Sequence, residues 1–420
     1  MNSTTILYSL IGGITFIAGV AAIWFLFATT PPPAPLPENE IGFGIGDNRV
    51  VNVPAEQTPA DTTAPATPQV EQKVFKVTDG PVTSATLVQT LHPTTTIARY
   101  VLAENGHVLD LVLESPGTVP KAISNTTIPG TAGAVWVENG NAVILQYVDN
   151  RVVKTVYLGF PVATVSTSSQ QRPVRIQFFP DNIVDITASP DGKSAAYLLA
   201  TAAGVDGYTA RSDSTGSKKL FSAPLSQMLL SWASPSTMLL QTKSSTGIPS
   251  IAFSVNAQTG AVVPLLYALG LTAIADRTFS YIVYQTIGSG NLVNSYVRDV
   301  KTGKDVKLSF NPLPPKCIWG PKTASSLYCA SPLEYTPPNY LELWYKGAAS
   351  MSDALFFFNV SSGESEIITA PGGEEGGVLS DILELTVSPD EKYLLFTKKG
   401  DRSLWAMRLS AQATTTPTTP

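Results

Sequence analysis

Charged side chains are scarce in this chain of 420 residues. They make up 14% of the sequence, against about 25% in an ordinary soluble domain, and the net charge is −5. Nucleic-acid binding through phosphates needs a surplus of Lys and Arg, so this class is excluded. Histidine and cysteine number two each, too few for a zinc module or a small disulfide framework. The glycine-rich residues 42–46 lie among prolines rather than between a strand and a helix, so we expect no phosphate loop and no cofactor.

The shortage of charge is greatest near the N-terminus, where the first acid is Glu38 and the first base is Arg49. Residues 6–28 are uncharged and mostly apolar. As a helix they would be about 34 Å long, enough to cross a hydrocarbon core of about 30 Å. A cleaved signal peptide is the alternative, but it needs a basic start and a small-residue cleavage site, which this segment lacks. We therefore expect an uncleaved transmembrane anchor that follows a short tail, residues 1–5.

Neither end of the apolar segment has basic residues close by, so charge does not set its orientation. Because only five residues precede it, we expect the bulk of the chain to lie outside the cytoplasm, at the cell membrane. Residues 29–72 are rich in Pro, Thr and Ala and cannot bury enough apolar surface to fold, so they predict a disordered stalk. Residues 411–420 predict a second disordered tail, and residues 73–410 remain for the folded domain.

The folded region contains short apolar runs separated by Gly, Pro, Asp and Ser, which is typical of all-β structure. One phrase recurs as strand, turn and strand: residues 186–193 (ITASPDGK) and residues 385–392 (LTVSPDEK) each precede an apolar run. A second phrase is a turn that ends in glycine, at Gly216, Gly260, Gly303 and Gly363. The first three are 44 and 43 residues apart, and the last interval is 60. Two hairpins in about 43 residues indicate a four-stranded propeller blade.

Seven such blades are predicted, with six or eight remaining open. The last unit holds only three strands of its own. Residues 73–77, just after the stalk, would supply its fourth strand, close the ring and cover an exposed edge. The expected units are 83–126, 131–180, 183–222, 228–266, 270–310, 316–370 and 381–410.

The turn phrase resembles the repeat of TolB-like (Trp-Asp-repeat-like) propellers, in which a strand ending in Trp-Ser-Pro-Asp-Gly-Lys turns into an apolar strand. Residues 189–193 match it well, residues 388–390 match partly, and Trp232 and Trp319 stand at the Trp position of degraded copies. The resemblance implies a propeller but little about chemistry, because propellers host many functions. It implies a protein-interaction scaffold of the bacterial envelope, or the regulatory domain of a prolyl-oligopeptidase-type peptidase. The second class needs a Gly-x-Ser-x-Gly elbow, which this sequence lacks.

Candidate catalytic residues are few. His92 lies in a Pro/Thr turn and His107 opens a strand, and neither has the partners of a catalytic triad or a metal site, so we expect structural or solvated roles. Carboxylate-only chemistry needs two or three acids around a channel. Asp185, Asp276 and Asp381 lie near the ends of predicted innermost strands. They keep a glycan-binding or glycan-cleaving propeller open as the alternative function.

Cys317 and Cys329 flank a hairpin whose turn centres near Thr323, so they could face each other across adjacent strands. Outside the cytoplasm such a pair can form a disulfide. The alternative is two buried free thiols that pack as small apolar side chains. The sequence leaves both open.

The long interval in the sixth unit marks an insertion, residues 331–352, between its second and third strands. Pro338 could start a short helix that Gly347 ends. The insertion is rich in Tyr and Trp, which are favoured anchors in protein interfaces. The candidate partner-docking residues are Tyr335, Tyr340, Trp344 and Tyr345. The alternative is that they pack down on the blade as a lid.

Together these observations predict a single-pass membrane protein that displays a propeller outside the cytoplasm. We expect it to bind an envelope protein of unknown identity, without catalysis and without a metal. A sensor that signals across the membrane is disfavoured, because five residues on the other side leave little to signal with.

Overall fold

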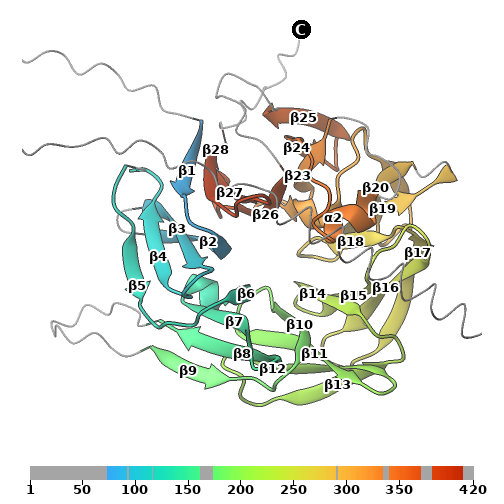
Figure 1. Cartoon of the computed structure of the whole chain (residues 1–420). Helices are drawn as coiled ribbons and strands as arrows, with labels where there is room; N and C mark the ends of the chain where they lie inside the picture. Colours follow the sequence, from blue (N-terminus) through green and yellow to red (C-terminus); the bar gives the residue numbers. More distant parts are fainter. Residues whose placement is uncertain are drawn as a thin grey trace, which may run out of the picture. The chain divides into compact units, whose positions relative to one another are not determined.

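Seven four-stranded antiparallel sheets stand around a common axis, like the blades of a propeller (Figure 1). They are formed by the residues that this computed structural model describes, which are 73–91, 94–115, 117–160, 174–289, 292–333, 340–369 and 381–409. All of these belong to one unit of the chain, residues 69–420. The predicted all-β propeller with seven four-stranded blades is therefore confirmed.

The first blades follow the chain, and in each the strands run in order from the inner to the outer edge of the sheet. Blade 1 holds β2 (Val82–Leu91), β3 (Thr94–Leu102), β4 (Val108–Val112) and β5 (Lys121–Ser124). Blade 2 holds β6 (Thr131–Val137), β7 (Ala142–Asp149), β8 (Val152–Gly159) and β9 (Arg175–Phe178). Blade 3 holds β10 (Ile183–Ala188), β11 (Ser194–Thr201), β12 (Gly204–Arg211) and β13 (Lys218–Ala223).

The next three blades repeat this order. Blade 4 holds β14 (Met228–Ser234), β15 (Thr237–Thr242), β16 (Pro249–Asn256) and β17 (Val262–Leu269). Blade 5 holds β18 (Thr272–Ala275), β19 (Tyr281–Ile287), β20 (Val293–Asp299) and β21 (Asp305–Lys307). Blade 6 holds β22 (Cys317–Trp319), β23 (Ser326–Pro332), β24 (Asp353–Asn359) and β25 (Glu364–Thr369).

Blade 7 is built from both ends of the propeller. Its inner strands are β26 (Ile382–Val387), β27 (Tyr393–Lys398) and β28 (Leu404–Arg408), and its outer strand is β1 (Val74–Thr78). Val74 pairs with Met407 in antiparallel register. The predicted closure by the first strand of the domain is therefore confirmed, and it covers the edge that β28 would otherwise expose.

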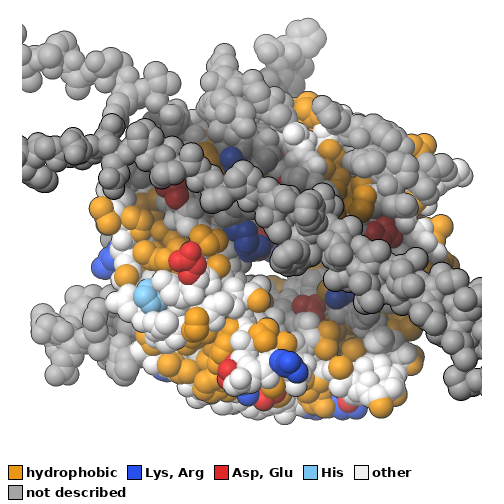
Figure 2. All heavy atoms as spheres, in the orientation of Figure 1, with side chains coloured by type: hydrophobic (Ala, Val, Ile, Leu, Met, Phe, Trp, Pro, Cys, Tyr) orange, Lys and Arg blue, Asp and Glu red, His pale blue; other side chains and the backbone are white. Residues whose placement is uncertain are grey.

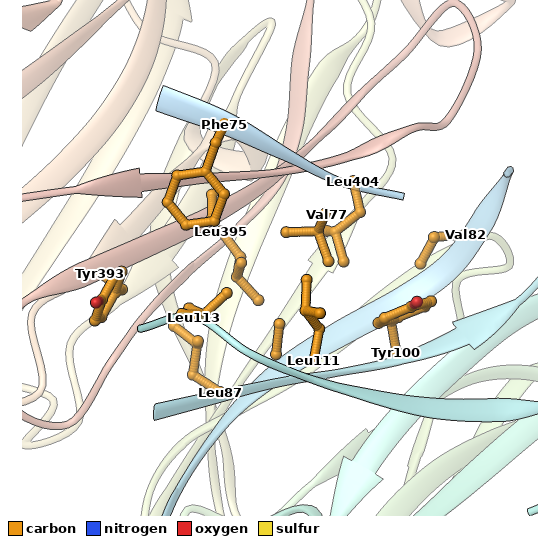
Figure 3. Packing of buried hydrophobic residues seen from close by; sticks show 12 residues of the cluster. Phe75, Val77, Val82, Leu87, Tyr100, Leu111, Leu113, Tyr393, Leu395 and Leu404 are labelled. Carbon is orange, nitrogen blue, oxygen red and sulfur yellow. The ribbon is translucent and has the colours of Figure 1, made fainter. Parts of the chain in front are cut away.

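Apolar side chains fill the space between neighbouring blades. Figure 3 shows the cluster between blades 7 and 1, with Phe75, Val77, Val82, Leu87, Tyr100, Leu111, Leu113, Tyr393, Leu395 and Leu404 labelled. Each such side chain contributes about 1.5–3 kcal/mol when it is fully buried. Because β1 supplies two of these residues, its packing as well as its hydrogen bonds closes the ring.

The propeller has two distinct faces. The inner strand comes first in every blade, so all inner strands run in the same direction along the axis. Helix α2 (Tyr340–Tyr345) lies in the connection between β23 and β24, at the end where the inner strands begin. We call this end the α2 face and the other end the opposite face. Lys73 and Leu409, the two ends of the described propeller, both lie at the opposite face, where the Arg408 amide donates to the Lys73 carbonyl.

The repeated turn phrases lie at the opposite face and form equivalent hydrogen bonds. In blade 3 the Ser189 hydroxyl donates to Asp191 Oδ1 at 2.6 Å, and in blade 7 the Ser388 hydroxyl donates to Asp390 Oδ1 at 2.7 Å. Gly192 takes a φ of 69°, a conformation that glycine adopts without strain. The four Gly-ended turns at residues 216, 260, 303 and 363 also have positive φ, between 68° and 75°. Both sequence phrases therefore correspond to turns in the structure. These turns all lie at the opposite face, and their glycines all have positive φ.

No helix among the described residues is long and apolar enough to cross a membrane. The predicted anchor at residues 6–28, the stalk at 29–72 and the tail at 411–420 lie outside those residues.

Candidate functional site

Helix α2 comes from blade 6 but bonds to three other blades. The Glu342 carboxylate accepts hydrogen bonds from the Thr246 amide at 2.5 Å and from the Ser245 hydroxyl at 3.2 Å, in the β15–β16 turn of blade 4. The Tyr340 hydroxyl donates to Gln285 Oε1 of blade 5 at 3.2 Å. Trp344 donates to Asp381, which precedes β26 of blade 7. The helix therefore crosses the α2 face near the centre of the ring (Figure 1).

The inward side of α2 is apolar and buried. Tyr340, Leu341 and Trp344 are at most 6% exposed and pack with Leu313 from the link between blades 5 and 6. Burial raises the pKa of the Tyr340 phenol well above its ordinary value. This packing matches the predicted lid, in which the aromatic side chains cover the blade beneath them.

A buried cluster of charges lies directly beneath the helix. Lys316 Nζ is 2.5 Å from Asp353 Oδ2 and 2.8 Å from Asp381 Oδ1, and all three side chains are at most 1% exposed. Lys316 ends the 3₁₀ turn η3 (Pro314–Lys316), Asp353 opens β24, and Asp381 precedes β26. Because these strands all begin at the α2 face, residues far apart in the sequence meet at this end of the ring.

Trp344 connects this cluster to the helix. Its indole Nε1 donates to both carboxylate oxygens of Asp381 at 2.9 Å. Lys399 Nζ donates to the Trp344 carbonyl and to the Ala349 carbonyl, each at 2.8 Å. The ammonium groups of Lys399 and Lys316 also lie 4.4 and 5.6 Å from the centre of the Trp344 ring. Ionic, hydrogen-bond and cation–π contacts thus hold α2 down on blades 6 and 7.

The two carboxylates of the cluster differ in their proton affinity. Burial raises the pKa of Asp353, and its Oδ1 has no hydrogen-bond partner among the described residues. Burial also acts on Asp381, but the charge of Lys316 and the bonds from Lys316 and Trp344 hold its pKa below the ordinary value. A pair of acids with separated pKa values is the arrangement of a glycosidase. Here both acids contact the same ammonium group beneath Trp344, so no substrate reaches them while α2 is in place.

The three acids that the sequence singles out are not brought together. Asp381 joins Asp353, whereas Asp185 accepts the Leu230 amide at 2.6 Å and so links blades 3 and 4. Burial raises the pKa of Asp185 to about 6. Asp276 follows β18 at the opposite face and caps its own turn by accepting the Tyr281 amide at 2.6 Å. These three carboxylates therefore do not meet at one mouth of the channel.

The four predicted docking residues divide into groups. Tyr340 and Trp344 are buried, and Tyr335 lies outside the described residues. Tyr345 is 46% exposed, and its neighbour Leu343 is 39% exposed. Exposed large apolar side chains on the described part of the insertion are therefore Leu333, Leu343 and Tyr345.

The cysteines and the histidines are placed as follows. Cys317 and Cys329 are directly paired residues of β22 and β23, and a disulfide joins them beneath the protein surface. His107 is partly buried and its Nε2 lies 3.2 Å from the Thr127 hydroxyl. His92 lies outside the described residues.

Exposed large apolar side chains are distributed unequally between the two faces. Among the described residues, the connections between strands on the α2 face hold six that are at least 38% exposed: Leu225, Ile248, Leu292, Leu333, Leu343 and Tyr345. The connections on the opposite face hold one, Val119. The other exposed large apolar side chains lie within strands. Figure 2 shows apolar patches around the ring and Lys or Arg side chains beside its central hollow.

Sequence reasoning missed Lys316 and Asp353. Each does carry a local signal, because a charged residue stands at the edge of an apolar strand: PPKCIWG around Lys316 and DALFFF from Asp353. An isolated charge beside a buried strand needs a partner of opposite sign. The sequence does not say which acid meets which base, since their pairing depends on the closure of the ring.

Comparison with known proteins adds support for the fold. No protein-family model matches the chain, and no curated protein matches it. The β-propeller domain of Cps50 (Swd1) from Myceliophteria thermophila has a TM-score of 0.50 at 9% identity, over 80% of this chain and 100% of that chain. TolB from Acinetobacter baumannii has a TM-score of 0.41 at 11% identity, over 78% of this chain. The alignment spans 63% of the TolB chain. At 9% identity the likeness to the Cps50 domain shows a propeller fold, as the turn phrases predict, and nothing of activity.

Proposed function

We propose that this protein is a non-enzymatic scaffold that binds a partner protein on its α2 face. The observation that carries the proposal is the contrast between the faces: within the described residues, the connections on the α2 face hold six exposed large apolar side chains and those on the opposite face hold one. Exposed apolar surface gathered on one face marks an interaction site rather than ordinary surface. Helix α2 is fixed to blades 4, 5 and 7, so the side chains it presents need little ordering on binding.

We propose further that the propeller is anchored in the cell membrane and lies outside the cytoplasm. The uncharged apolar residues 6–28 support the anchor. The disulfide between Cys317 and Cys329 supports an oxidising compartment. The described propeller starts and ends at the opposite face, so the chain enters and leaves it on the face away from α2. The proposed location is therefore the cell envelope, with the α2 face presented to other envelope proteins.

A glycan-cleaving propeller is the less supported alternative. Asp353 and Asp381 do lie close together, but Lys316 pairs with both of them and α2 covers them. Catalysis would require the helix to leave the cluster and expose two lysine-bound acids. Docking requires no rearrangement, and for this reason we favour it.

A photo-crosslinking experiment in intact cells tests the docking proposal. A photoreactive amino acid replaces Tyr345 on the α2 face or, as the control, Val119 on the opposite face, which is 91% exposed. We expect a discrete protein adduct from position 345 only. The identified protein should then bind the purified full chain, and Leu343→Asp should weaken this binding without lowering the melting temperature. Equal adducts from both positions, or none from position 345, would contradict the proposal.

The anchor has its own test. We expect the full chain to stay in the membrane fraction after an alkaline carbonate wash, and a chain without residues 6–28 to be released. Protease added to cells with a permeable outer layer should digest the propeller while the inner membrane is intact. A chain washed off by carbonate, or one protected from protease until the inner membrane is broken, would contradict anchoring or orientation respectively.

A further inference from the structure

One sector of the α2 face combines apolar and basic side chains. Its apolar members are Ile248 at 69% exposed, Leu292 at 51%, Tyr345 at 46% and Leu343 at 39%. Its basic members, Lys243 and Lys346, are also exposed. We call these six residues the basic–apolar patch. They come from blades 4, 5 and 6, and the question is what kind of partner they fit.

The patch is continuous because α2 touches the turns that carry its other members. Glu342 of α2 bonds to Thr246, which lies between Lys243 and Ile248 in the β15–β16 turn. Leu292 directly precedes Val293, whose side chain packs against the buried side of α2. Leu343, Tyr345 and Lys346 are part of the helix or follow it directly. The six residues therefore lie on or beside one short helix.

The charge of the patch has one sign. In the sequence of α2 and of residues 243–248 the single acid is Glu342. Its Oε1 accepts three hydrogen bonds, from the Thr246 amide, the Thr246 hydroxyl and the Ser245 hydroxyl. That carboxylate is thus engaged within the protein. Outside these two segments, the charge of Lys243 also acts on Asp185, where it opposes the rise in pKa that burial causes. Both lysines are exposed to solvent. A partner with negative charge beside its apolar side chains would complement the patch.

We infer that the basic–apolar patch binds a protein segment in which Asp or Glu residues flank aliphatic side chains. This rests on the proposed function, because it names the chemistry of the partner that docks on the α2 face. The aliphatic side chains of the partner pack against Ile248, Leu292 and Leu343, and its carboxylates pair with Lys243 and Lys346. An anionic membrane surface fits less well, because electrostatic lipid binding takes clusters of about 4–8 basic residues and the patch has two.

Selection from a random phage-displayed peptide library tests the inference without knowledge of the natural partner. The full chain, solubilised in mild detergent, is the immobilised target. We expect the selected peptides to be enriched in Asp or Glu next to Leu, Ile or Val. The double variant Lys243→Glu/Lys346→Glu should bind these peptides about tenfold more weakly and should select Lys-containing peptides instead. Leu343→Asp should weaken binding by a similar factor.

Matched controls separate the patch from the rest of the surface. Lys218→Glu reverses an exposed charge at the start of β13, on the opposite face, and should leave peptide binding unchanged. Melting temperatures of all variants should agree with that of the unmodified chain, which shows that the fold is kept. Phosphatidylserine vesicles serve as the second probe, with phosphatidylcholine vesicles as their control.

Three outcomes would overturn the inference. The first is selection of peptides without acidic enrichment, or of none. The second is peptide binding that Leu343→Asp and the charge reversal leave unchanged. The third is binding to phosphatidylserine vesicles that the charge reversal abolishes, which would assign the patch to a membrane. If position 345 crosslinks a protein and the selected peptides lack acids, the partner chemistry is wrong while the docking function stands.

Discussion

The two faces of this propeller differ in the sequence range of the contacts that stabilise them. At the opposite face each repeated turn is stabilised within a few residues, as where the Ser189 hydroxyl bonds to Asp191 and the Ser388 hydroxyl to Asp390. The bond from Ser189 lowers the pKa of Asp191, so this exposed turn favours the ionised acid. These contacts repeat because each needs only a short stretch of sequence.

At the α2 face the main contacts join distant parts of the chain. Lys316 meets Asp353 and Asp381, which are 37 and 65 residues further along the sequence. Burial raises the pKa of Asp353 and of Asp185 on this face, whereas Lys316 and Trp344 hold the pKa of Asp381 low, so here the proton affinity of an acid depends on burial and on distant partners. The comparison teaches that local repeats build the ring, while unique long-range charges fix the face that we propose to be functional.

The largest predicted effect concerns the lysine of the cluster. Lys316→Met removes the ammonium group that pairs with Asp353 and Asp381, and both carboxyl groups stay buried. Breaking a buried ion pair from one side costs about 3–5 kcal/mol of unfolding free energy. Urea denaturation of the variant and of the unmodified chain at neutral pH measures this loss.

An exposed ion pair supplies the control. Lys219 Nζ lies 2.8 Å from Asp206, and the lysine side chain is 50% exposed. Lys219→Met should therefore change the unfolding free energy little, because exposed pairs contribute little. Equal losses from the two variants would contradict the contrast between a buried long-range cluster and ordinary surface pairs.

Much of the fold was predictable because its signals are local. The Ser-Pro-Asp phrases at residues 189–191 and 388–390 and the Gly-ended turns specify hairpins by side-chain bonding and positive φ. Their spacing then gives the blade, and counting strands gives seven blades and the role of residues 73–77. All but one of these steps use residues that are close in sequence. The exception is the closure of blade 7, which is predicted because its last unit has only three strands.

The candidate site was less predictable for the same reason. The insertion at residues 331–352 is visible as a longer interval, and its aromatic content is visible too. Which of its aromatic side chains point inward depends on partners in other blades, such as Gln285 for Tyr340 and Asp381 for Trp344. Asp381 was singled out as an acid near an inner strand, but its partner Lys316 was not. One sequence shows which residues are charged, but it does not show which acid pairs with which base.

A smaller effect is expected from the pH dependence of the α2 face. The folded pKa of Asp185 is about 6, against about 3.9 in an unfolded chain. The folded protein therefore binds this proton more tightly, and stability falls as the pH rises from about 4 through about 6. The shift of about two units corresponds to about 3 kcal/mol, to within a factor of two.

The matched variant is Asp185→Asn, which does not titrate. Between pH 4 and pH 7 the unmodified chain should lose about 3 kcal/mol of unfolding free energy relative to this variant. Denaturation curves in urea at pH 4, 5.5 and 7 give the difference, in which groups common to both proteins cancel. A difference that is constant over this pH range would show that Asp185 is not buried as an acid at the junction of blades 3 and 4.

The smallest effect sharpens the comparison at the opposite face, through two glycines with the same backbone conformation. Gly192 and Gly216 have φ of 69° and 68°. A Cβ at Gly216 would meet no atom of the described residues within 4 Å, so Gly216→Ala should cost only the strain of positive φ, about 1 kcal/mol. A Cβ at Gly192 would lie 2.7 Å from the backbone nitrogen of Glu138 in blade 2. The same Glu138 amide donates a hydrogen bond to the Gly192 carbonyl.

Gly192→Ala should therefore cost about 2 kcal/mol, since it adds a clash between blades to the same backbone strain. Urea denaturation of the two variants under one set of conditions measures the difference. A larger loss at Gly192 would show that the Ser-Pro-Asp-Gly turn also positions neighbouring blades, so that even the locally stabilised face has a long-range component. Equal losses would mean that blade 2 yields to the added methyl group, and that the contact between Glu138 and Gly192 adds little to the local stability of this turn.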